Sequence, residues 1–191
     1  MTDPLIEQAR MANDAAALLR SSIDYDGATG EFFWRERPVD HFATARVHKS
    51  WNRQFAGRPV HVGRDKDGYG KIRIGSHYFK AHRAAWLLTY GAWPRNEVDH
   101  ISGDRRDNRI SNLRDVSKIE NRRNQSRRRD NTSGVTGVRR HEGRWRAEIH
   151  FQGKCQSLGR FAVFEDAVKA RKAAEARLGY HPNHGRTQGA V

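Results

Sequence analysis

The sequence predicts an α+β protein built from small units rather than from one large core. Hydrophobic residues make up 36% of the 191 residues, and the mean hydropathy is −0.93. These values favour small cores joined by polar segments. Helical periodicity occurs near both ends of the chain, and strand-like segments lie between. We expect a small α/β segment, then a strand–loop–strand–helix unit, then a three-stranded antiparallel sheet packed on one helix.

The first part of the chain combines helices with short strands. Apolar residues recur at near-helical spacing over residues 2–21, which predicts a helix. Gly91 ends a later helix, and Pro94 follows just beyond it. Between these points the expected elements are a turn at 24–30, a strand at 31–34, an irregular stretch at 35–66, a hairpin of 71–74 with 77–80, and a helix from 82 to 90.

A polar stretch, VDHISGDRRDNRISNLR, runs from Val98 to Arg114. Residues 98–101 predict a short strand, residues 102–109 a charged loop, and residues 110–116 a second strand or extended arm. Ser117 and Glu120 then match the capping box, so a helix should begin at Ser117. We expect Asp107 and Asn108 to be turn residues only.

The C-terminal part predicts a sheet with one covered face. Strands are expected at 135–140, 144–151 and 154–161, and a helix at 163–178. Alternation in 144–151 turns four apolar residues, Trp145, Ala147, Ile149 and Phe151, towards the helix. The opposite face should be open and basic, with Arg139, Arg144, Arg146, His150, Lys154, Gln156 and Arg160. The expected divisions of the chain are 1–22, 23–91, 92–128 and 129–191.

The charge of the chain indicates a polyanionic partner. The net charge is +14 and the isoelectric point is about 10.7, which favours nucleic acid, and we expect double-stranded DNA. Neither a bilayer-spanning apolar run nor a signal-peptide pattern is evident, so no membrane partner is expected. The single cysteine, Cys155, excludes an intrachain disulfide and a Cys-x-x-Cys zinc site, and it favours a cytoplasmic setting.

The polar stretch contains the groups that phosphodiester hydrolysis needs. A histidine can take a proton from water near neutral pH, and a divalent cation can stabilise the charge that develops on oxygen. Oxygen donors from Asp and Asn side chains, without cysteine, suit Mg²⁺ or Mn²⁺ better than Zn²⁺. Asp99 and His100 are adjacent, however, and neighbours on a regular strand point to opposite faces.

The spacing of His100, Asn112 and Asn121 resembles the motif of phage-type HNH homing endonucleases, which have a ββα-metal fold. The resemblance implies that His100 is the general base and that Asn112 braces the loop. It implies that Asp99 and Asn121 bind the metal, although Asn124 is an open alternative to Asn121. His82 is expected to pack or to cap a helix. The products would be a 5′-phosphate and a 3′-hydroxyl. If the enzyme is encoded by a phage, it would act in the cytoplasm of the bacterial host.

The C-terminal part is similar to the AP2 DNA-binding domain, on the stretch SGVTGVRRHEGRWRAEIHFQGKCQSLGRF. The resemblance implies that the sheet places the nuclease on DNA. Thr136 and His150 depart from the usual AP2 pattern, so no target sequence carries over. A basic junction, expected to follow the DNA backbone, consists of Arg122, Arg123, Arg127, Arg128 and Arg129.

Three questions about function stay open at this point. A non-catalytic DNA-binding regulator with a structural HNH core is the alternative to an endonuclease. An RNA-binding protein is a weaker alternative, because most aromatic residues fall on apparent core faces rather than on exposed stacking surfaces. We expect a monomer or weak dimer, and since one HNH site cuts one strand at a time, double-strand cleavage would need two protomers or two events.

Overall fold

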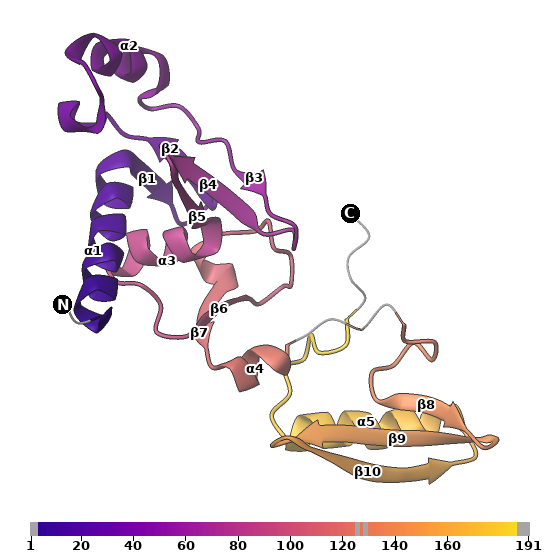
Figure 1. Ribbon diagram of the computed structural model, residues 1–191. Helices are drawn as coiled ribbons and strands as arrows, with labels where there is room; N and C mark the ends of the chain where they lie inside the picture. Colours follow the sequence, from indigo (N-terminus) through magenta and orange to yellow (C-terminus); the bar gives the residue numbers. More distant parts are fainter. Residues whose placement is uncertain (1–3, 125–126, 128–129, 187–191) are drawn as a thin grey trace. The chain divides into compact units, whose positions relative to one another are not determined.

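The computed structural model describes residues 4–124, 127 and 130–186, and its elements confirm the α+β class (Figure 1). The chain forms two compact units. The first contains Met1–His100 and Asp104–Asp115, and the second contains Ile101–Gly103 and Val116–Val191. Each unit has its own core, as the low hydrophobic content predicts. In the described part of the chain, no helix combines the length and the apolar character needed to cross a bilayer.

The first unit consists of helices and short strands, several of which pack around helix α3. Its helices are α1 (Pro4–Ser22), α2 (Ala45–Phe55) and α3 (Ala81–Tyr90), with 3-10 turns η1 (Val39–His41) and η2 (Ile110–Asn112). Its strands are β1 (Ile23–Asp26), β2 (Glu31–Trp34), β3 (Gly63–Arg64), β4 (Gly70–Ile74), β5 (His77–Lys80), β6 (Glu97–His100) and β7 (Leu113–Val116). They pair as β1–β2, β3–β4–β5 and β6–β7.

Helix α3 is the centre of this unit. It contacts α1, β1, β4, β5 and η2, and its Ala84, Ala85 and Leu87 are buried. Ile72 and Leu19 reach the same core from β4 and α1. Because these small and branched side chains lock the helix against the strands, α3 is a rigid support for the segments that pack on it.

Two expectations for the first unit are wrong. Residues 24–26 of the predicted turn belong to strand β1, which pairs with β2 in a hairpin closed by residues 27–30. The stretch 35–66 contains helix α2, whose N-cap Thr44 accepts a hydrogen bond from the amide of Val47. The signal was the recurrence of Val47, Trp51 and Phe55 at every fourth position, which weak flanking hydrophobicity obscured.

The second unit contains the predicted sheet and its covering helix. The elements are α4 (Lys118–Arg122), β8 (Val138–His141), β9 (Arg144–Phe151), β10 (Lys154–Phe161) and α5 (Phe164–Arg177). The strand order is β10–β9–β8, and α5 contacts all three strands (Figure 1). Ala147 and Ile149 are buried on the helix side of β9, which confirms the predicted alternation.

A register shift in β10 corrects the predicted membership of the open face. Lys154 pairs with Phe151 and Gln156 pairs with Ile149, so both side chains leave the sheet on the side of the apolar residues. The register then shifts between Ser157 and Gly159. Because one extra residue reverses the faces beyond it, Arg160 does lie on the open side, whereas the placement of Lys154 and Gln156 there is wrong.

An arginine holds the covering helix to the sheet. Arg171 of α5 is buried, and its guanidinium donates to the carbonyl oxygen of Glu148 at 2.6 Å and to the carboxylate of Glu175 at 2.9 Å. Its remaining nitrogen lies 3.2 Å from Nε2 of His184. Gly137 makes room for this network, since a Cβ at that position would lie 2.6 Å from Nη1 of Arg171 and the residue has a φ of 75°.

Candidate active site

Strand β6 carries the two residues that the sequence singles out. It pairs with β7, and Asp99 and His100 at its end are both buried. They contact different neighbours, as alternation along a strand predicts. Asp99 faces Arg114 of β7, whereas His100 faces the rings of His82 and Tyr69. The structure therefore places the candidate base His100 and the candidate metal ligand Asp99 at one strand end, with distinct surroundings.

His100 lies in a pocket of aromatic rings and amides. Its side chain is only 3% exposed, and its ring meets that of His82 edge-on with centroids 5.2 Å apart. Tyr69, in the turn between β3 and β4, stands 5.9 Å from His100 and 5.0 Å from His82. His82 is itself 5% exposed, and no hydrogen-bond partner is found for its Nδ1 among the described residues. It packs rather than caps α3, whose N-cap is Lys80.

Asn108 sets the orientation of the His100 imidazole. The amide oxygen of Asn108 lies 3.5 Å from Nε2 of His100, and its amide nitrogen donates to the carbonyl oxygen of Arg106 at 3.1 Å. The second bond fixes which end of the amide faces the histidine. In that orientation the amide oxygen can accept from Nε2–H, which is the tautomer with the basic lone pair of the neutral ring on Nδ1. The expectation that Asn108 is only a turn residue is wrong.

Burial keeps His100 neutral. Desolvation lowers the pKa of His100, and the contact with Asn108 and the charges of Asp99, Asp104 and Asp107 oppose that shift without reversing it. The pKa of its neighbour His82 falls to about 3, again mainly because of burial. A neutral imidazole is the form that can accept a proton from water at pH 7.

The loop that presents Asn108 is braced from several sides. Asn112 donates from its side-chain amide to the carbonyl oxygen of Asp107 at 2.8 Å, as expected for a bracing residue. The carboxylate of Asp107 accepts from Arg109 and from its backbone amide, which confirms a turn role for Asp107. The hydroxyl of Tyr25 donates to the carbonyl oxygen of Asn108 at 2.6 Å. Asn112 thus acts on His100 through the loop.

The β1–β2 turn approaches the same loop closely. Gly30 has a φ of 80°, and a Cβ there would lie 2.7 Å from the backbone nitrogen of Arg109 and 2.9 Å from the carbonyl carbon of Asn108. Only glycine suits both the conformation and the contact. The first hairpin of the chain therefore takes part in positioning the site, a role that no local motif announces.

Asp99 is paired with an arginine. Nε and Nη2 of Arg114 donate to Oδ2 of Asp99 at 3.0 and 2.7 Å. Among the described residues, no group of three or more His, Cys, Asp or Glu side chains could hold a metal ion. A cation here would therefore need amide or water oxygens beside the Asp99 carboxylate. Such a hard, oxygen-only donor set fits Mg²⁺ or Mn²⁺, provided that Arg114 shares or yields Oδ2.

The other predicted ligand belongs to the second unit. Asn121 lies in α4, whose capping box is formed by reciprocal bonds between Ser117 and Glu120, as predicted. The backbone amide of Asn121 donates to the carbonyl oxygen of Ser117. Asn124 is 1% exposed, and its amide oxygen accepts from Arg186 at 3.0 Å. That oxygen of Asn124 therefore already has a cationic donor, and both Asn121 and Asn124 stay open as candidate ligands.

Two cations near His100 were missed by the sequence reasoning. Lys80 and Arg105 both lie over the ring of Tyr69, at 4.7 and 4.6 Å from its centroid. Lys80 also faces Asp65 at 3.9 Å, and Arg105 donates to the carbonyl oxygen of Asp67. Held in this way beside the base, they can attract a phosphate. Their only sequence signal was general basic character.

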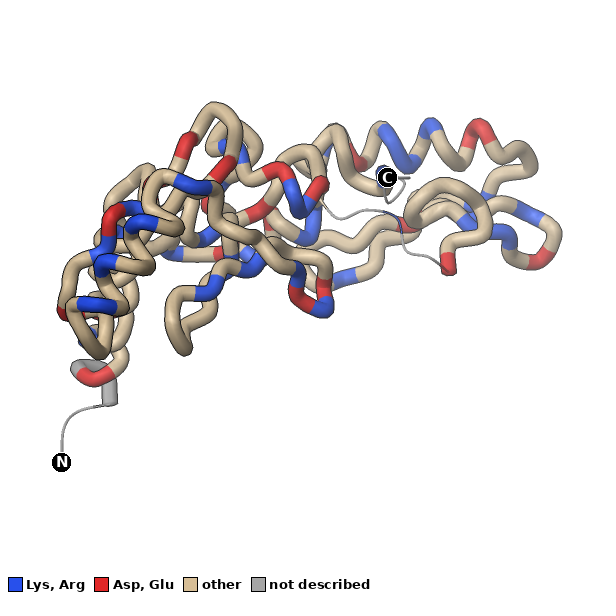
Figure 2. Tube along the Cα trace, turned by 90° about the horizontal axis from the view of Figure 1, so that it is seen from above, with Lys and Arg blue, Asp and Glu red and all other residues tan. Residues whose placement is uncertain are grey.

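The open face of the second unit carries a row of arginines. Arg139, Arg146 and Arg160 are directly opposite one another on β8, β9 and β10. Glu148 pairs with Arg139 and with Arg146, at 3.3 and 3.2 Å, and Glu142 pairs with Arg160. Figure 2 shows Lys and Arg along both units, not in a single block. The row is basic but partly neutralised, which the sequence pattern did not reveal.

The remaining predicted DNA contacts have varied surroundings. Arg122, Arg144, His150 and Lys154 are exposed. Arg123 lies over the rings of Phe151 and Tyr180, and Arg127 donates to the carbonyl oxygen of Gly134. Arg128 and Arg129 lie outside the described residues. Arg123 and Arg127 thus have structural contacts within the second unit.

Comparisons with known proteins bear on the first of the two predicted resemblances. No curated protein matches the chain. A solved structure on DNA binding and cleavage by the HNH homing endonuclease I-HmuI is 25% identical, with 55% of this chain and 51% of that chain covered. This chain thus spans about half the length of that enzyme, and a TM-score of 0.36 does not establish a common overall fold. The AP2-like resemblance stays a prediction. Residues 79–123, from β5 to the end of α4, match the model of the HNH endonuclease family, and this segment holds His100, Asn112 and Asn121.

Proposed function

We propose that this protein is a metal-dependent endonuclease that hydrolyses phosphodiester bonds of double-stranded DNA. The observation that carries the proposal is the state of His100. A buried, neutral imidazole, turned by Asn108 so that Nδ1 is basic, lies within the segment that matches HNH endonucleases. A general base needs a neutral ring with one basic nitrogen, and this tautomer supplies it.

The chemistry assigned to these residues is a single displacement at phosphorus. Nδ1 of His100 takes a proton from a water molecule, and the water oxygen forms a bond to phosphorus. The bond from phosphorus to the 3′ oxygen breaks, and that oxygen leaves with the electron pair and is protonated from solvent. The products are a 5′-phosphate and a 3′-hydroxyl. Asn108 and, through the loop, Asn112 hold the base in place.

A divalent cation, Mg²⁺ or Mn²⁺, would when bound offset negative charge on the phosphate oxygens and the leaving oxygen. We propose Asp99 as one ligand, from its carboxylate at the end of β6, and Asn121 as another, from the spacing of the HNH motif. In the described structure Oδ2 of Asp99 accepts two bonds from Arg114. Arg114 therefore sets how readily that carboxylate is given to a cation.

We further propose that residues 92–128 serve as the nuclease core and 129–191 as an AP2-like module that places it on DNA. The arginine row of the sheet suits contact with phosphates or base edges of a groove. The proposed contacts are Arg122, Arg123, Arg127, Arg128, Arg129, Arg139, Arg144, Arg146, His150 and Arg160, and Lys154 is left out because it lies on the apolar side of the sheet. The enzyme would act in the cytoplasm as a monomer or weak dimer.

The test is cleavage of supercoiled plasmid by the full chain with Mg²⁺, with Mn²⁺ and with chelator. We expect nicked or linear DNA only with metal. His100→Ala should lower the rate about 10²–10⁴-fold while DNA binding is retained. His77→Ala, which changes an exposed histidine of β5, is the matched control and should cut like the parent. No cutting with any metal would refute the enzyme, and cutting by His100→Ala would refute the assigned base.

One observation favours the alternative, a DNA-binding regulator with a structural HNH core. Arg114 occupies the Asp99 carboxylate, so an arginine already supplies the positive charge that a metal would bring. Under this alternative the parent would not cut DNA, Asp99→Asn would only lower stability, and DNA binding would not respond to Mg²⁺. The plasmid assay therefore decides between the two functions.

A further inference from the structure

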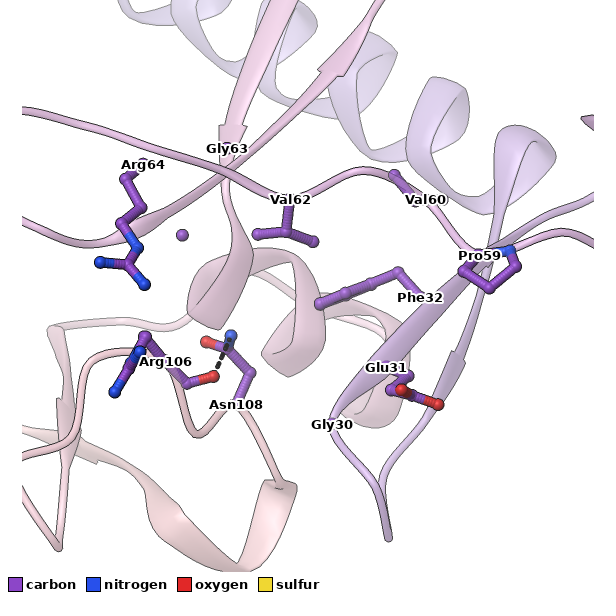
Figure 3. Close-up of a pocket in the computed structure, with 11 residues that line it drawn as sticks. Gly30, Glu31, Phe32, Pro59, Val60, Val62, Gly63, Arg64, Arg106 and Asn108 are labelled. Carbon is purple, nitrogen blue, oxygen red and sulfur yellow. Dashed lines mark hydrogen bonds between the residues drawn. The ribbon is translucent and has the colours of Figure 1, made fainter. Parts of the chain in front are cut away.

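A cavity of about 290 Å³ lies beside the candidate active site in the first unit (Figure 3). Its wall includes Phe32, Val60 and Val62 from the β2 region and the segment before β3, and Asn108 from the braced loop. The charged residues of the lining are Arg64, Arg106 and Glu31. No residue of the HNH motif that the sequence singles out, His100 and Asn112 included, lines this cavity, so the proposed hydrolysis does not account for it.

The two sides of the cavity differ in chemistry. Figure 3 shows Arg64 and Arg106 on one side and the apolar Val62 and Phe32 towards the other. Among the described residues, the carboxylate partner of Arg106 is the exposed Asp104, at 3.6 Å, and such surface pairs contribute little. Within the described chain, no carboxylate lies within ion-pair distance of Arg64. The arginine side can therefore accept an anion, and the other side can accept an apolar surface.

Asn108 separates this cavity from the catalytic histidine. Its amide nitrogen bonds to the carbonyl oxygen of Arg106, marked by the dashed line in Figure 3, and its amide oxygen faces His100. One side chain thus lines the cavity and orients the base. A group bound in the cavity would lie one side chain away from the reacting phosphate.

Size and chemistry point to one occupant. A cavity near 300 Å³ is at the small end of ligand sites and is too small for a duplex. A nucleotide combines a phosphate, which arginines bind with paired hydrogen bonds, with a sugar whose carbon face is apolar. We propose that this cavity binds one nucleotide of the cleaved DNA strand, next to the scissile bond. Its phosphate lies between Arg64 and Arg106, and its deoxyribose packs on Val62 and Phe32.

This inference rests on the proposed function, because it assigns a neighbour to the cleaved bond. It predicts that the effects of removing the charges of Arg64 and Arg106 and of neutralising one flanking phosphate on the cleavage rate are coupled. After the cleavage site is mapped on plasmid, duplexes are made with a neutral methylphosphonate at each of the three phosphates on either side of it. Single-turnover cleavage is measured for the parent, for Arg64→Ala/Arg106→Ala, and for Arg10→Ala, which changes an exposed arginine of α1.

We expect one flanking methylphosphonate to slow the parent about tenfold, the size of one charge-assisted contact. The double variant should cut native DNA about tenfold more slowly and should lose no further rate with that methylphosphonate. Arg10→Ala should reproduce the parent at every position. The assignment would be overturned if, at all six positions, the methylphosphonate and the double variant slowed cleavage by independent factors that multiply. That result would not contradict the endonuclease activity itself.

Two further variants separate charge from shape. Arg64→Lys keeps a point charge and should recover part of the lost rate. Val62→Phe leaves both arginines in place but fills the cavity, and it should slow cleavage to a similar extent without changing the circular dichroism spectrum or the melting temperature by more than a few degrees. Parent-like cleavage by a folded Val62→Phe variant would overturn the inference.

Once the cleavage site has been mapped, a binding measurement tests the inference independently of the cleavage rate. Fluorescence anisotropy of the same duplexes with the full chain in chelator reports the same coupling through affinity. If the parent never cuts DNA, the proposed function fails. The cavity assignment fails separately if the methylphosphonates weaken binding of the parent and the double variant equally. Tight binding of a free deoxynucleoside monophosphate without any coupling to duplex phosphates would also overturn it.

Discussion

Replacing Asn108 by alanine should separate the orientation of the base from the stability of the fold. The change removes the hydrogen bond to the carbonyl oxygen of Arg106 at 3.1 Å and the contact with Nε2 of His100 at 3.5 Å. A net hydrogen bond is worth about 1 kcal/mol, and a buried donor left without a partner costs about 1–3 kcal/mol. We expect the free energy of unfolding of the first unit to fall by about 2 kcal/mol in urea titrations.

The effect on the reaction should be smaller than loss of the base itself. If the Asn108 amide contributes about 1 kcal/mol to holding Nδ1 of His100 towards water, the single-turnover cleavage rate should fall about five- to tenfold. Removal of His100 should cost about 10²–10⁴-fold. The assay is plasmid nicking with enzyme in excess, at a temperature where urea titrations show the variant to be folded.

Tyr25→Phe is the matched control for this prediction. It removes the hydroxyl that donates to the backbone carbonyl of Asn108 at 2.6 Å, but it leaves the Asn108 amide in place. We expect a loss of stability of about 1 kcal/mol with little change in rate. If Asn108→Ala cuts at the parent's rate, or if both variants lose rate in proportion to stability, the amide does not orient the base.

Three further predictions concern the second unit. Burial lowers the pKa of His184 from 6.5 in the unfolded chain to about 4 in the folded protein. Between about pH 4 and pH 6.5 the unfolded state therefore binds more protons than the folded state. Stability should be full above about pH 6.5 and fall by on the order of 3 kcal/mol towards pH 4, and His184→Gln should flatten this dependence in urea titrations. Arg171→Ala leaves Glu175 buried beside only Lys172, so unfolding should become about 3–5 kcal/mol easier, and an unchanged melting curve would contradict the network. Arg146→Ala should reduce the slope of log affinity for duplex DNA against log salt by about 0.9, whereas Arg10→Ala should not.

The sequence by itself determined the periodic and locally encoded features. The hairpin of β4 and β5, the capping box at Ser117, the alternation of β9 and the covering helix α5 all follow from contacts between residues close in the chain. The HNH spacing also identified the segment that matches the family. Local patterns suffice there because the same few residues create both the signal and the structure.

Features that depend on remote partners could not be predicted in this way. The register shift in β10 reversed the faces of Lys154 and Gln156, and alternation alone cannot locate a bulge. Helix α2 was missed because its aromatic residues gain partners only when Trp34 and Phe42 are brought near. Arg171 had one hint, since it lies on the same helix face as Ala167 and Ala174, where an apolar residue is expected.

In the candidate site, too, some features were predicted from the sequence and others depend on the tertiary structure. The predicted roles of His100 as the base, Asp99 as a metal ligand and Asn112 as a brace come from the resemblance to HNH endonucleases. That Asn108 faces His100, that Arg114 holds Asp99, and that His82 and Tyr69 enclose the base were decided by tertiary structure. The reason is physical: a sequence records which groups exist, but desolvation, tautomer and ion pairing depend on what folding places within a few ångströms of each group.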